Sequence, residues 1–332
     1  RDLHVRSRRQ RQMCIRDRAM RDQITQQIMM IRPVAFSKNK ETSINNYFQV
    51  DTELAATLIQ KKALQEFDDF VQKLREASIE VHVFEDTQDP STPDSIFPNN
   101  WVSFHQNGSV ILYPMFANNR RLERRCDLID ALGSDFKITE VFEDLLSFES
   151  HHKFLEGTGS LILDRVNHIA YASYSDRTER EVILAFEKLT AYSVISFNAY
   201  QNVNGQRLPI YHTNVMMSIG DRFVLICAEA IDDRIERELV LASFMNQAKE
   251  IILISEDQLN NYVGNMLQVK NKNNVCFLVM STRAFQSLNA QQKQQLEKYG
   301  TLLHSNLTTI EMLGGGSARC MMAEIFLPTK ES

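Results

Sequence analysis

The feature of this chain that most constrains its fold is a hairpin-like pattern that recurs along the sequence. Each copy consists of two short apolar runs, rich in Val and Ile, that flank a polar turn. Such runs separated by Asn-Gly or Gly-Asp turns are typical of β-hairpins. The turn positions Gly108, Asn167 and Gly220 lie 59 and 53 residues apart, which indicates a repeated structural unit. The three copies are WVSFHQNGSVILYP (101–114), SLILDRVNHIAYASYS (160–175) and VMMSIGDRFVLICAEA (215–230).

A charged stretch with apolar residues at helical spacing follows each hairpin, and a further apolar run follows each of these stretches. In the second copy, for example, Val182, Phe186 and Leu189 would lie on one helix face. One unit therefore reads strand, strand, helix, strand. Because repetition around an axis protects sheet edges, we expect an α/β fold, specifically a five-fold pseudo-symmetric α/β propeller of ββαβ units.

The two ends of the chain supply the remaining, partial units. Residues 24–85 predict a strand, a long helix and a strand, and the C-terminal part predicts a strand in 273–282, a helix near 284–298 and a strand in 318–327. Three consecutive glycines, Gly314–Gly316, precede that last run and make up three of only 11 glycines in the chain. They indicate either a simple turn or a place where the backbone must approach another group closely.

Composition favours one folded domain over residues 20–330. The chain has 332 residues, of which 43% are hydrophobic, enough for a sizeable core. Residues 1–19 form a basic tail that we expect to be disordered or non-native, with the native start at Met20 or Met13. Residues 1–18 hold seven Arg and two Asp, so the formal charge of −5 becomes about −10 for the remainder. An acidic folded part argues against a nucleic-acid partner.

No apolar run approaches the length of a membrane span, and the start lacks a hydrophobic signal segment, so we expect a cytoplasmic protein with no membrane partner. The five cysteines are far apart and include no Cys-x-x-Cys pair, which argues against a structural zinc site or a disulfide framework. No phosphate-binding Gly-rich loop or ligand cluster is present either. The sequence therefore predicts neither a metal nor a cofactor.

The segments that enter the first strand of each unit carry polar and reactive side chains. If the units surround an axis, these entry segments converge, and residues distant in sequence can form one site. A thiol, an imidazole and a carboxylate are the parts of a cysteine nucleophile, its general base and the group that orients the base. Taken singly, each has a structural explanation, such as a buried thiol or a turn carboxylate. The entry residues are Asn99 and Asn100 in FPNNW, Glu156 in LEGTGS, His212 and Asn214 in YHTN, and Cys320 in GGGSARC.

The segments FPNNW, EGTGS, YHTN and GGGSARC resemble those of the guanidine-modifying superfamily, which has the pentein fold. That superfamily includes arginine deiminases, amidinotransferases, dimethylarginine dimethylaminohydrolases and succinylarginine dihydrolases. The similarity covers about residues 28–328 and is greatest to an amidinotransferase-like bacterial branch, the citrulline-utilisation hydrolases. The resemblance implies that Cys320 attacks the central carbon of a guanidino or ureido group. It also implies that His212 transfers protons and that Glu156 holds the imidazole or binds a substrate nitrogen.

The sequence departs from the arginine deiminase pattern at two positions, where Asn100 and Asn214 replace carboxylates that clasp a guanidinium. Amides forfeit charge-assisted hydrogen bonds to a cation, worth about 1.5–3 kcal/mol each. An amide both donates and accepts, which suits a neutral ureido group, so a citrulline-like substrate is favoured. The same asparagines are also compatible with simple caps at strand entries. Asn99 is a further candidate substrate contact. Arg319 would either hold a substrate carboxylate or face away from the site.

Two other functions are compatible with the sequence. An amidinotransferase would pass the adduct to an amine instead of water, and the sequence does not distinguish the acceptors. A non-catalytic binding protein on the same scaffold is the alternative from another class, although the joint presence of Cys320, His212 and Glu156 argues against it. The expected partner is a small molecule with a guanidino or ureido group, and formation of a homo-oligomer is left open.

Overall fold

The computed structural model describes residues 22–330 of the chain. The basic tail predicted at residues 1–19 lies outside the described residues. Within the described part, the predicted unit occurs five times, each time as a three-stranded sheet with its helix. In every sheet the first strand runs antiparallel to the second, and the second runs parallel to the third. The prediction of an α/β fold is therefore confirmed.

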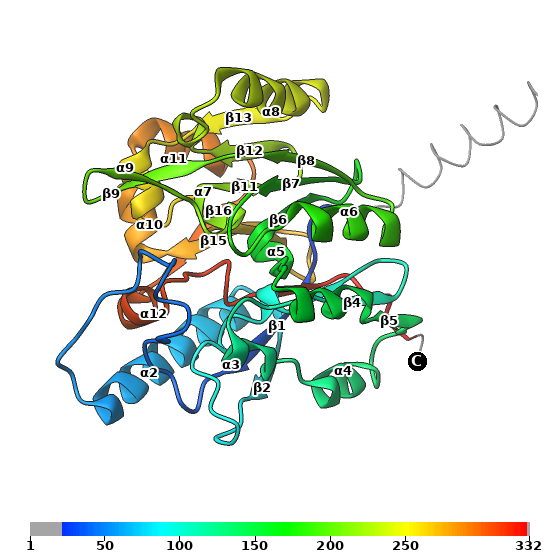
Figure 1. Ribbon diagram of the computed structural model, residues 1–332, viewed down its shortest axis with the longest axis vertical. Helices are drawn as coiled ribbons and strands as arrows, with labels where there is room; N and C mark the ends of the chain where they lie inside the picture. The colour runs from blue at the N-terminus through cyan, green and yellow to red at the C-terminus, as the bar shows by residue number, and fades with distance from the viewer. Residues whose placement is uncertain (1–21, 331–332) are drawn as a thin grey trace, which may run out of the picture.

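The five units follow one another along the chain, except that the first is assembled from both chain ends (Figure 1). Its first strand is the last strand of the protein. As strand, strand, helix and strand, the units are β17 (Ala323–Ile325), β1 (Gln27–Arg32), α2 (Ala56–Glu76) and β2 (Glu80–Glu85); β3 (Val102–Phe104), β4 (Ser109–Leu112), α4 (Cys126–Leu132) and β5 (Glu140–Phe142); β6 (Leu161–Asp164), β7 (Ile169–Ser173), α6 (Arg180–Leu189) and β8 (Ser193–Phe197); β11 (Met217–Ile219), β12 (Phe223–Ile226), α8 (Arg234–Asn246) and β13 (Glu250–Leu253); and β14 (Leu267–Lys270), β15 (Cys276–Ser281), α11 (Ala290–Glu297) and β16 (Thr301–Ser305).

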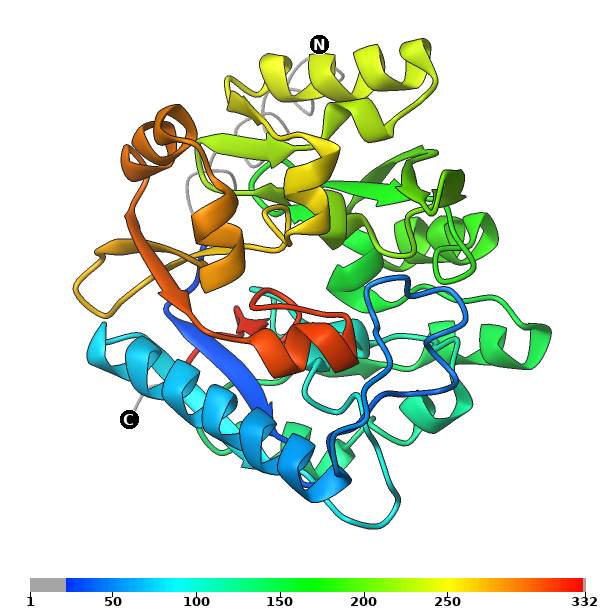
Figure 2. The same cartoon turned by 90° about the vertical axis from the view of Figure 1, so that its left-hand side faces the viewer.

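The helices of the units lie on the outside of the molecule and the sheets lie inside (Figures 1 and 2). Apolar residues at helical spacing explain this arrangement, because they give each helix one buried face. First strands of neighbouring units contact one another, as β17 does with β3 and β11 does with β6 and β14. Among residues 22–330, no helix combines the length and apolarity needed to cross a bilayer. The buried face of α2, for instance, comprises Ile59, Ala63, Phe67, Phe70, Val71 and Leu74.

Short helical turns stand before the first strands and between other elements. The turns η1, α5 and α7 lead directly into β3, β6 and β11, so each entry segment ends in a tight backbone turn. A hairpin of β9 and β10 is an addition that the sequence pattern did not predict. These further elements are η1 (Pro98–Asn100), α3 (Asn118–Arg121), η2 (Asp144–His151), α5 (Gly157–Ser160), β9 (Tyr200–Val203), β10 (Gln206–Pro209), α7 (Thr213–Met216), η3 (Ala228–Ala230), α9 (Glu256–Asn260), α10 (Thr282–Ser287) and α12 (Thr308–Gly314).

The prediction for the C-terminal part was wrong in two respects. The expected strand in 318–327 is confined to β17, and Cys320 lies in a turn where its N–H donates to Ser317 O over 3.0 Å. In addition, β17 pairs with β1 rather than completing the fifth unit. The fifth unit instead has its own strands β14 and β16, which were not predicted because they are only four and five residues long.

Candidate active site

A small pocket lies where the entry segments of the units meet. It encloses about 250 Å³ of empty space, its open mouth included. Six stretches of the chain that are separated in the sequence contribute side chains or backbone to its wall. The lining residues are Asn46, Asp94, Phe97, Asn100, Arg120, Arg177, Tyr211, His212, Gly314, Gly315, Gly316 and Cys320.

A buried carboxylate and a buried imidazole form the first feature of the site. The Nε2–H of His212 donates to Glu156 Oε2 over 2.8 Å, and both side chains are almost fully buried. Glu156 Oε1 accepts the backbone N–H of Phe116 over 2.9 Å. The pair joins the entries of the third and fourth units. This bond leaves Nδ1 as the ring nitrogen of His212 that Glu156 does not engage.

The environment holds this pair as a carboxylate and a neutral imidazole. Burial lowers the pKa of His212 to about 4, although the hydrogen bond to Glu156 raises it in part. Burial alone would raise the pKa of Glu156, but the charge of Arg177 and the bond from His212 lower it to about 2. At neutral pH, His212 is therefore able to accept a proton and Glu156 is ionised.

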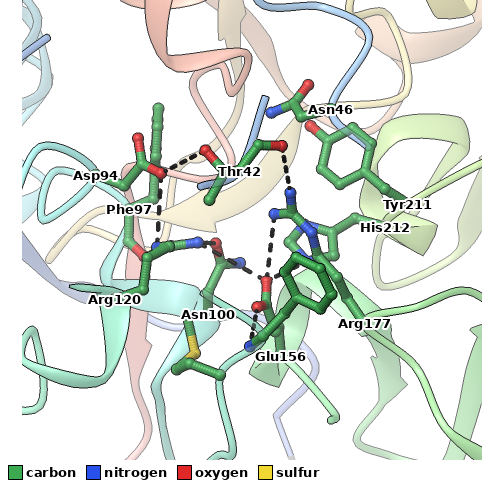
Figure 3. A network of polar contacts seen from close by, with 12 residues as sticks. Thr42, Asn46, Asp94, Phe97, Asn100, Arg120, Glu156, Arg177, Tyr211 and His212 are labelled. Atoms are coloured by element: carbon green, nitrogen blue, oxygen red, sulfur yellow. Dashed lines mark hydrogen bonds and ion pairs between the residues drawn. The ribbon is translucent and has the colours of Figure 1, made fainter. Parts of the chain in front are cut away.

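Two buried arginines flank Glu156, and the sequence analysis identified neither. The Nη1 atoms of Arg177 and Arg120 lie 3.6 and 3.8 Å from Glu156 Oε2. Figure 3 shows the two guanidinium groups approaching the carboxylate from different sides. Arg120 also forms an ion pair with Glu123, at 2.9 Å between Nη2 and Oε2, and donates through Nη1 to Asn100 Oδ1 over 2.7 Å. A dense network of charges therefore surrounds the imidazole.

A long segment between β1 and α2 reaches over this network. Figure 2 shows the segment running beside α12. Thr42 connects two members of the site, because its hydroxyl donates to Asp94 Oδ2 over 3.0 Å and its carbonyl accepts from Arg177 Nη2 over 2.9 Å. Asn39 donates to the same Asp94 oxygen over 2.8 Å. The other oxygen of Asp94, Oδ1, is buried and accepts no hydrogen bond from the described residues.

The thiol of Cys320 is held between two carboxamides. Asn214 Nδ2 donates to Cys320 Sγ over 3.3 Å, and Asn265 Nδ2 donates to the same sulfur over 3.1 Å. Cys320 is 3% exposed and opens on the pocket that His212 also lines. The buried Oδ1 of Asn214 has no hydrogen-bond partner among the described residues. The structure thus places Cys320, His212 and Glu156 at one site, with Asn214 behind the sulfur.

Two glycines of the EGTG segment allow the predicted asparagines to approach. A Cβ on Gly159 would lie 2.4 Å from Asn100 Nδ2 and 2.9 Å from the His212 ring. Gly157 has φ +45° and packs against the carbonyls of Asn99 and Asn100. Asn100 lines the pocket, whereas Asn99 lies behind it, accepting from Asn100 Nδ2 over 3.1 Å.

The three glycines before Cys320 end α12 and form one wall of the pocket. Gly315 has φ +65°, in the left-handed region, and its N–H donates to Glu311 O over 3.0 Å. A Cβ on Gly315 would lie 2.5 Å from Asn46 Nδ2. The Gly315 carbonyl accepts from the Tyr211 hydroxyl over 2.6 Å. The glycines therefore serve both expected purposes, a helix-ending turn and a close approach.

Arg319 faces a different part of the molecule. Its guanidinium donates to Met322 O and to Glu324 Oε2, each over 2.9 Å, and Arg319 is absent from the residues that line the pocket. Positions 319 and 320 were predicted to be neighbours on a strand, but both lie in a turn. Among residues 22–330, no group of three or more His, Cys, Asp or Glu side chains is placed to hold a metal ion.

Repetition in the sequence contains signals for the residues that were missed. Arg120 and Arg177 occupy similar places, in NNRR and SDRT, shortly after the second strand of their hairpins. The matching Arg234 in DDRI is exposed and pairs with Glu238, so position alone does not bring an arginine into the site. Asn265 precedes β14 and is the entry residue of the fifth unit, which was overlooked because β14 was not recognised.

Comparison with known proteins identifies the family of this chain and proteins of similar fold. A family model described as "N,N dimethylarginine dimethylhydrolase, eukaryotic" matches residues 32–327. No match was found among curated protein sequences. Solved structures share the fold at low identity. An arginine dihydrolase from the ornithine–ammonia cycle in cyanobacteria has 17% identity and a TM-score of 0.69, with 91% of this chain and 41% of that chain covered.

Two further solved structures define the extent of the similarity. The isolated N-terminal domain of the arginine dihydrolase, bound to substrate, has 18% identity and a TM-score of 0.67, with 91% of this chain and 98% of that domain covered. A dimethylarginine dimethylaminohydrolase in an adduct with S-methyl-L-thiocitrulline has 14% identity and a TM-score of 0.57, with 91% and 100% covered. The present chain thus spans about two fifths of the full-length arginine dihydrolase. The chain belongs to the N,N-dimethylarginine dimethylhydrolase family of the pentein superfamily.

Proposed function

We propose that this protein uses Cys320 as a nucleophile to hydrolyse a C–N bond in the guanidino or ureido group of an arginine-related metabolite. The observation that carries the proposal is the buried bond of 2.8 Å between His212 and Glu156 beside a pocket that Cys320 also lines. A nucleophile, a base and a group that orients the base are the parts that such catalysis requires. We also propose that a pseudo-five-fold axis relates the five units, which would explain why their entry segments converge.

The state of His212 specifies how protons move in the proposed reaction. Because His212 is neutral at rest, it accepts the Cys320 proton as Sγ attacks the central carbon and forms the C–S bond. The resulting imidazolium, stabilised by Glu156, gives that proton to the leaving nitrogen as the C–N bond breaks. His212 then takes a proton from water, which attacks the thio-adduct. Cleavage of the C–S bond returns the proton to sulfur and regenerates the thiol.

A citrulline-like substrate is supported by the two asparagines of the site. Asn214 is not among the residues that line the pocket, and it donates through Nδ2 to the sulfur, so it leaves the surroundings of the nucleophile uncharged without contacting the substrate. Asn100 is oriented by Arg120, which donates to its Oδ1. Neither carboxamide carries the negative charge that would compensate a cation, which favours a neutral reacting group.

One observation favours a second substrate, a methylated arginine. Asp94 lines the pocket, is buried and keeps Oδ1 without a partner among the described residues, so it is able to accept from a cationic group. The ionised Glu156 adds a second negative charge nearby. The matched family description names dimethylarginine, and a cationic guanidinium would then be balanced by carboxylates rather than by Asn100 and Asn214.

Arg177 supports recognition of a substrate carboxylate. Its partners in the segment over the site are neutral, namely Asn45 Oδ1 at 3.0 Å and the Thr42 carbonyl at 2.9 Å. Among the described residues, Glu156 is the carboxylate that forms an ion pair with Arg177, with its Oε2 atom 3.6 Å from Nη1. A guanidinium that lines a pocket and has no carboxylate within hydrogen-bond distance is suited to bind the α-carboxylate of an amino acid.

Turnover of four substrates side by side tests the proposal. Purified protein is given citrulline, arginine, Nω,Nω-dimethylarginine and succinylarginine, and the release of ammonia or dimethylamine is measured with Cys320→Ser as control. The proposal predicts turnover of citrulline or of dimethylarginine that Cys320→Ser abolishes. Fast deimination of free arginine would exclude the citrulline preference, and turnover that survives in Cys320→Ser would exclude the proposed chemistry.

A further inference from the structure

We propose that Asn265 is a positioning residue that fixes the sulfur of Cys320 and favours its thiolate form. This inference rests on the proposed role of Cys320 as nucleophile and extends it to the fifth unit of the repeat. Asn265 is 1% exposed and is not among the residues that line the pocket, so it acts through Cys320 rather than on the substrate.

The carboxamide of Asn265 holds both the backbone and the side chain of Cys320. Its Oδ1 accepts the backbone N–H groups of Arg319 and Cys320 over 3.0 and 3.4 Å. Its Nδ2 donates to Cys320 Sγ over 3.1 Å and to the Asn214 carbonyl over 3.2 Å. The planar carboxamide of Asn265 thereby fixes the orientation of the Cys320 side chain, because it binds both the backbone N–H and the sulfur of that residue.

The sulfur accepts two N–H groups, one from Asn265 and one from Asn214. Hydrogen bonds to an ionised acceptor are stronger than those to a neutral one, so two donors stabilise a thiolate more than a thiol. Asp and Glu carboxylates in the same place would do the opposite. An amide therefore suits a position directly behind a nucleophilic sulfur.

The backbone around Asn265 is built to bring its carboxamide to the sulfur. A Cβ on Gly264 would lie 2.3 Å from Val215 O, so the Gly264 backbone packs directly against the helical turn α7 that carries Asn214. Only glycine permits this approach. The entries of the fourth and fifth units are thus held together next to Cys320, which comes from the entry of the first unit.

Other charged and titratable groups near Cys320 are unchanged in the variants considered below, so they do not confound the comparison. Arg319 is the adjacent residue and pairs with Glu324. Tyr262 interacts electrostatically with the Cys320 thiol from the loop before β14. The groups that line the pocket with Cys320 are Asp94, Arg120, Arg177, Tyr211 and His212.

The test measures the reactivity of the thiol itself and needs no substrate. The rate of Cys320 alkylation by iodoacetamide is followed from pH 5 to pH 10 by peptide mass mapping, which separates Cys320 from the other cysteines. Asn265→Asp keeps the acceptor for the two backbone N–H groups and places a negative charge at the sulfur. We expect it to lower alkylation at pH 7 at least about 10-fold and to move the half-maximal rate at least about one pH unit upward.

Asn265→Ala is the second variant, since it removes the donor without adding a charge, and a smaller upward shift is expected. Asn271→Ala is the matched control. Asn271 is a buried asparagine of the same unit whose Nδ2 donates to Ala77 O over 2.9 Å and whose Oδ1 accepts from Asn273 N and Val275 N. We expect its loss, like that of Asn265, to lower the melting temperature but to leave the alkylation profile of Cys320 within about twofold of wild type.

The possible outcomes separate this inference from the proposed function. Wild-type pH profiles in both Asn265→Asp and Asn265→Ala, in protein that melts cooperatively, overturn the role of Asn265 and leave the nucleophile unaffected. Shifted profiles in a protein that turns over none of the four substrates support Asn265 and refute the proposed function. A Cys320 thiol that is inert at every pH in wild-type protein overturns both. In an active enzyme, Asn265→Asp should lower kcat and leave KM within about threefold.

Discussion

The first strand of each unit has an entry end and a hairpin-turn end, and similar side chains lie in different surroundings at these two ends. At the entry end, His212 is buried with Arg120, Arg177 and the carboxylate of Glu156. At the hairpin-turn end of the second and third units, a cavity with about 930 Å³ of empty space, its open mouth included, is lined by His105, His168, Arg165 and Tyr192 among others. No Asp or Glu is among the described residues that line this second cavity.

The contrast between His212 and His105 shows what the carboxylate contributes. Both rings are buried and both use Nε2 in a bond of 2.8 Å, His212 to Glu156 and His105 to the Ser103 hydroxyl. Burial, reinforced by Arg165, lowers the pKa of His105 to about 3. Burial also lowers the pKa of His212, to about 4, but there the carboxylate offsets part of the effect. Only His212 has a counter-charge able to stabilise an imidazolium formed during a reaction.

The largest effect on activity is expected when the buried thiol of Cys320 is removed, whereas removal of the buried thiol of Cys227 should change activity little. Cys320→Ser should lower kcat at least about 10³-fold, because a serine hydroxyl in the same place is a far weaker nucleophile. Cys227 is equally buried, but burial raises the pKa of its thiol to about 12, so Cys227→Ser should keep activity within about threefold. Steady-state release of the nitrogen product measures both. Similar losses in the two variants would contradict the account.

Replacing the two histidines tests the comparison directly. His212→Gln should lower kcat about 10²- to 10⁴-fold, because proton transfer to and from the reacting groups is lost. His105→Gln keeps a polar group near Ser103 and should leave kcat within about threefold of wild type. The same kinetic assay applies, with the melting temperature recorded for each variant. If His105→Gln is the more damaging change to kcat in folded protein, the assignment of the active end of the strands is wrong.

Gly159→Ala is expected to have a smaller effect. The added Cβ would lie 2.4 Å from Asn100 Nδ2 and 2.9 Å from the His212 ring, so the imidazole must shift. We expect a loss of about 10- to 100-fold in kcat, since small misplacements of catalytic groups cost this much. Gly133→Ala is the control, because Gly133 lies at the end of α4 and its Cβ would meet only Asp130 and Ile129 carbonyl groups, at 3.0 Å or more. Equal activity in both variants would argue against a tightly placed His212.

The smallest expected effect is a loss of stability in acid. The pKa values of His212 and His105 are lower in the folded than in the unfolded protein, so the unfolded state binds protons first as the pH falls below about 6.5. Each histidine should then cost roughly 2 to 3 kcal/mol of the free energy of unfolding between pH 7 and pH 4.5. The low pKa of Glu156 adds a loss only below about pH 4.5.

Urea unfolding at pH 7 and pH 4.5 measures this acid effect. His105→Gln should flatten the pH dependence, since it removes one of the two buried rings. An unchanged pH dependence in His105→Gln would show that this imidazole is already protonated or exposed in the folded protein. The comparison between the two ends of the strands would then need revision.

Much of the fold was predictable because residues close together in the sequence determine the strands, turns and helices of the repeated unit. The Asn-Gly turn at Gly108 and the apolar spacing of Val182, Phe186 and Leu189 depend on neighbouring residues only. The pairing of β17 with β1 was not predictable in this way, because it joins residues about 300 positions apart. The short β14 was missed for a different reason, since the alternation of apolar and polar residues from Leu267 to Lys270 extends over only four positions.

The candidate site was predictable where one residue type carries the chemistry. Cys320, His212 and Glu156 stand out because few side chains can act as nucleophile, base or orienting group. The role of a buried arginine depends on its partners instead. Arg177 enters the site through contacts with Thr42 and Asn45, more than 130 positions away, and no local pattern reveals them. Asn265 was not predicted because β14, the strand that it precedes, was not recognised from the sequence.

Labelling of the nucleophile tests the central claim most directly. The protein is treated with 2-chloroacetamidine at neutral pH, digested and analysed by mass spectrometry, while activity is followed in parallel. The account predicts one label per chain, on Cys320, in proportion to the loss of activity, and no such label in Cys320→Ser. A label on another cysteine that accompanies inactivation while Cys320 stays unmodified would contradict it.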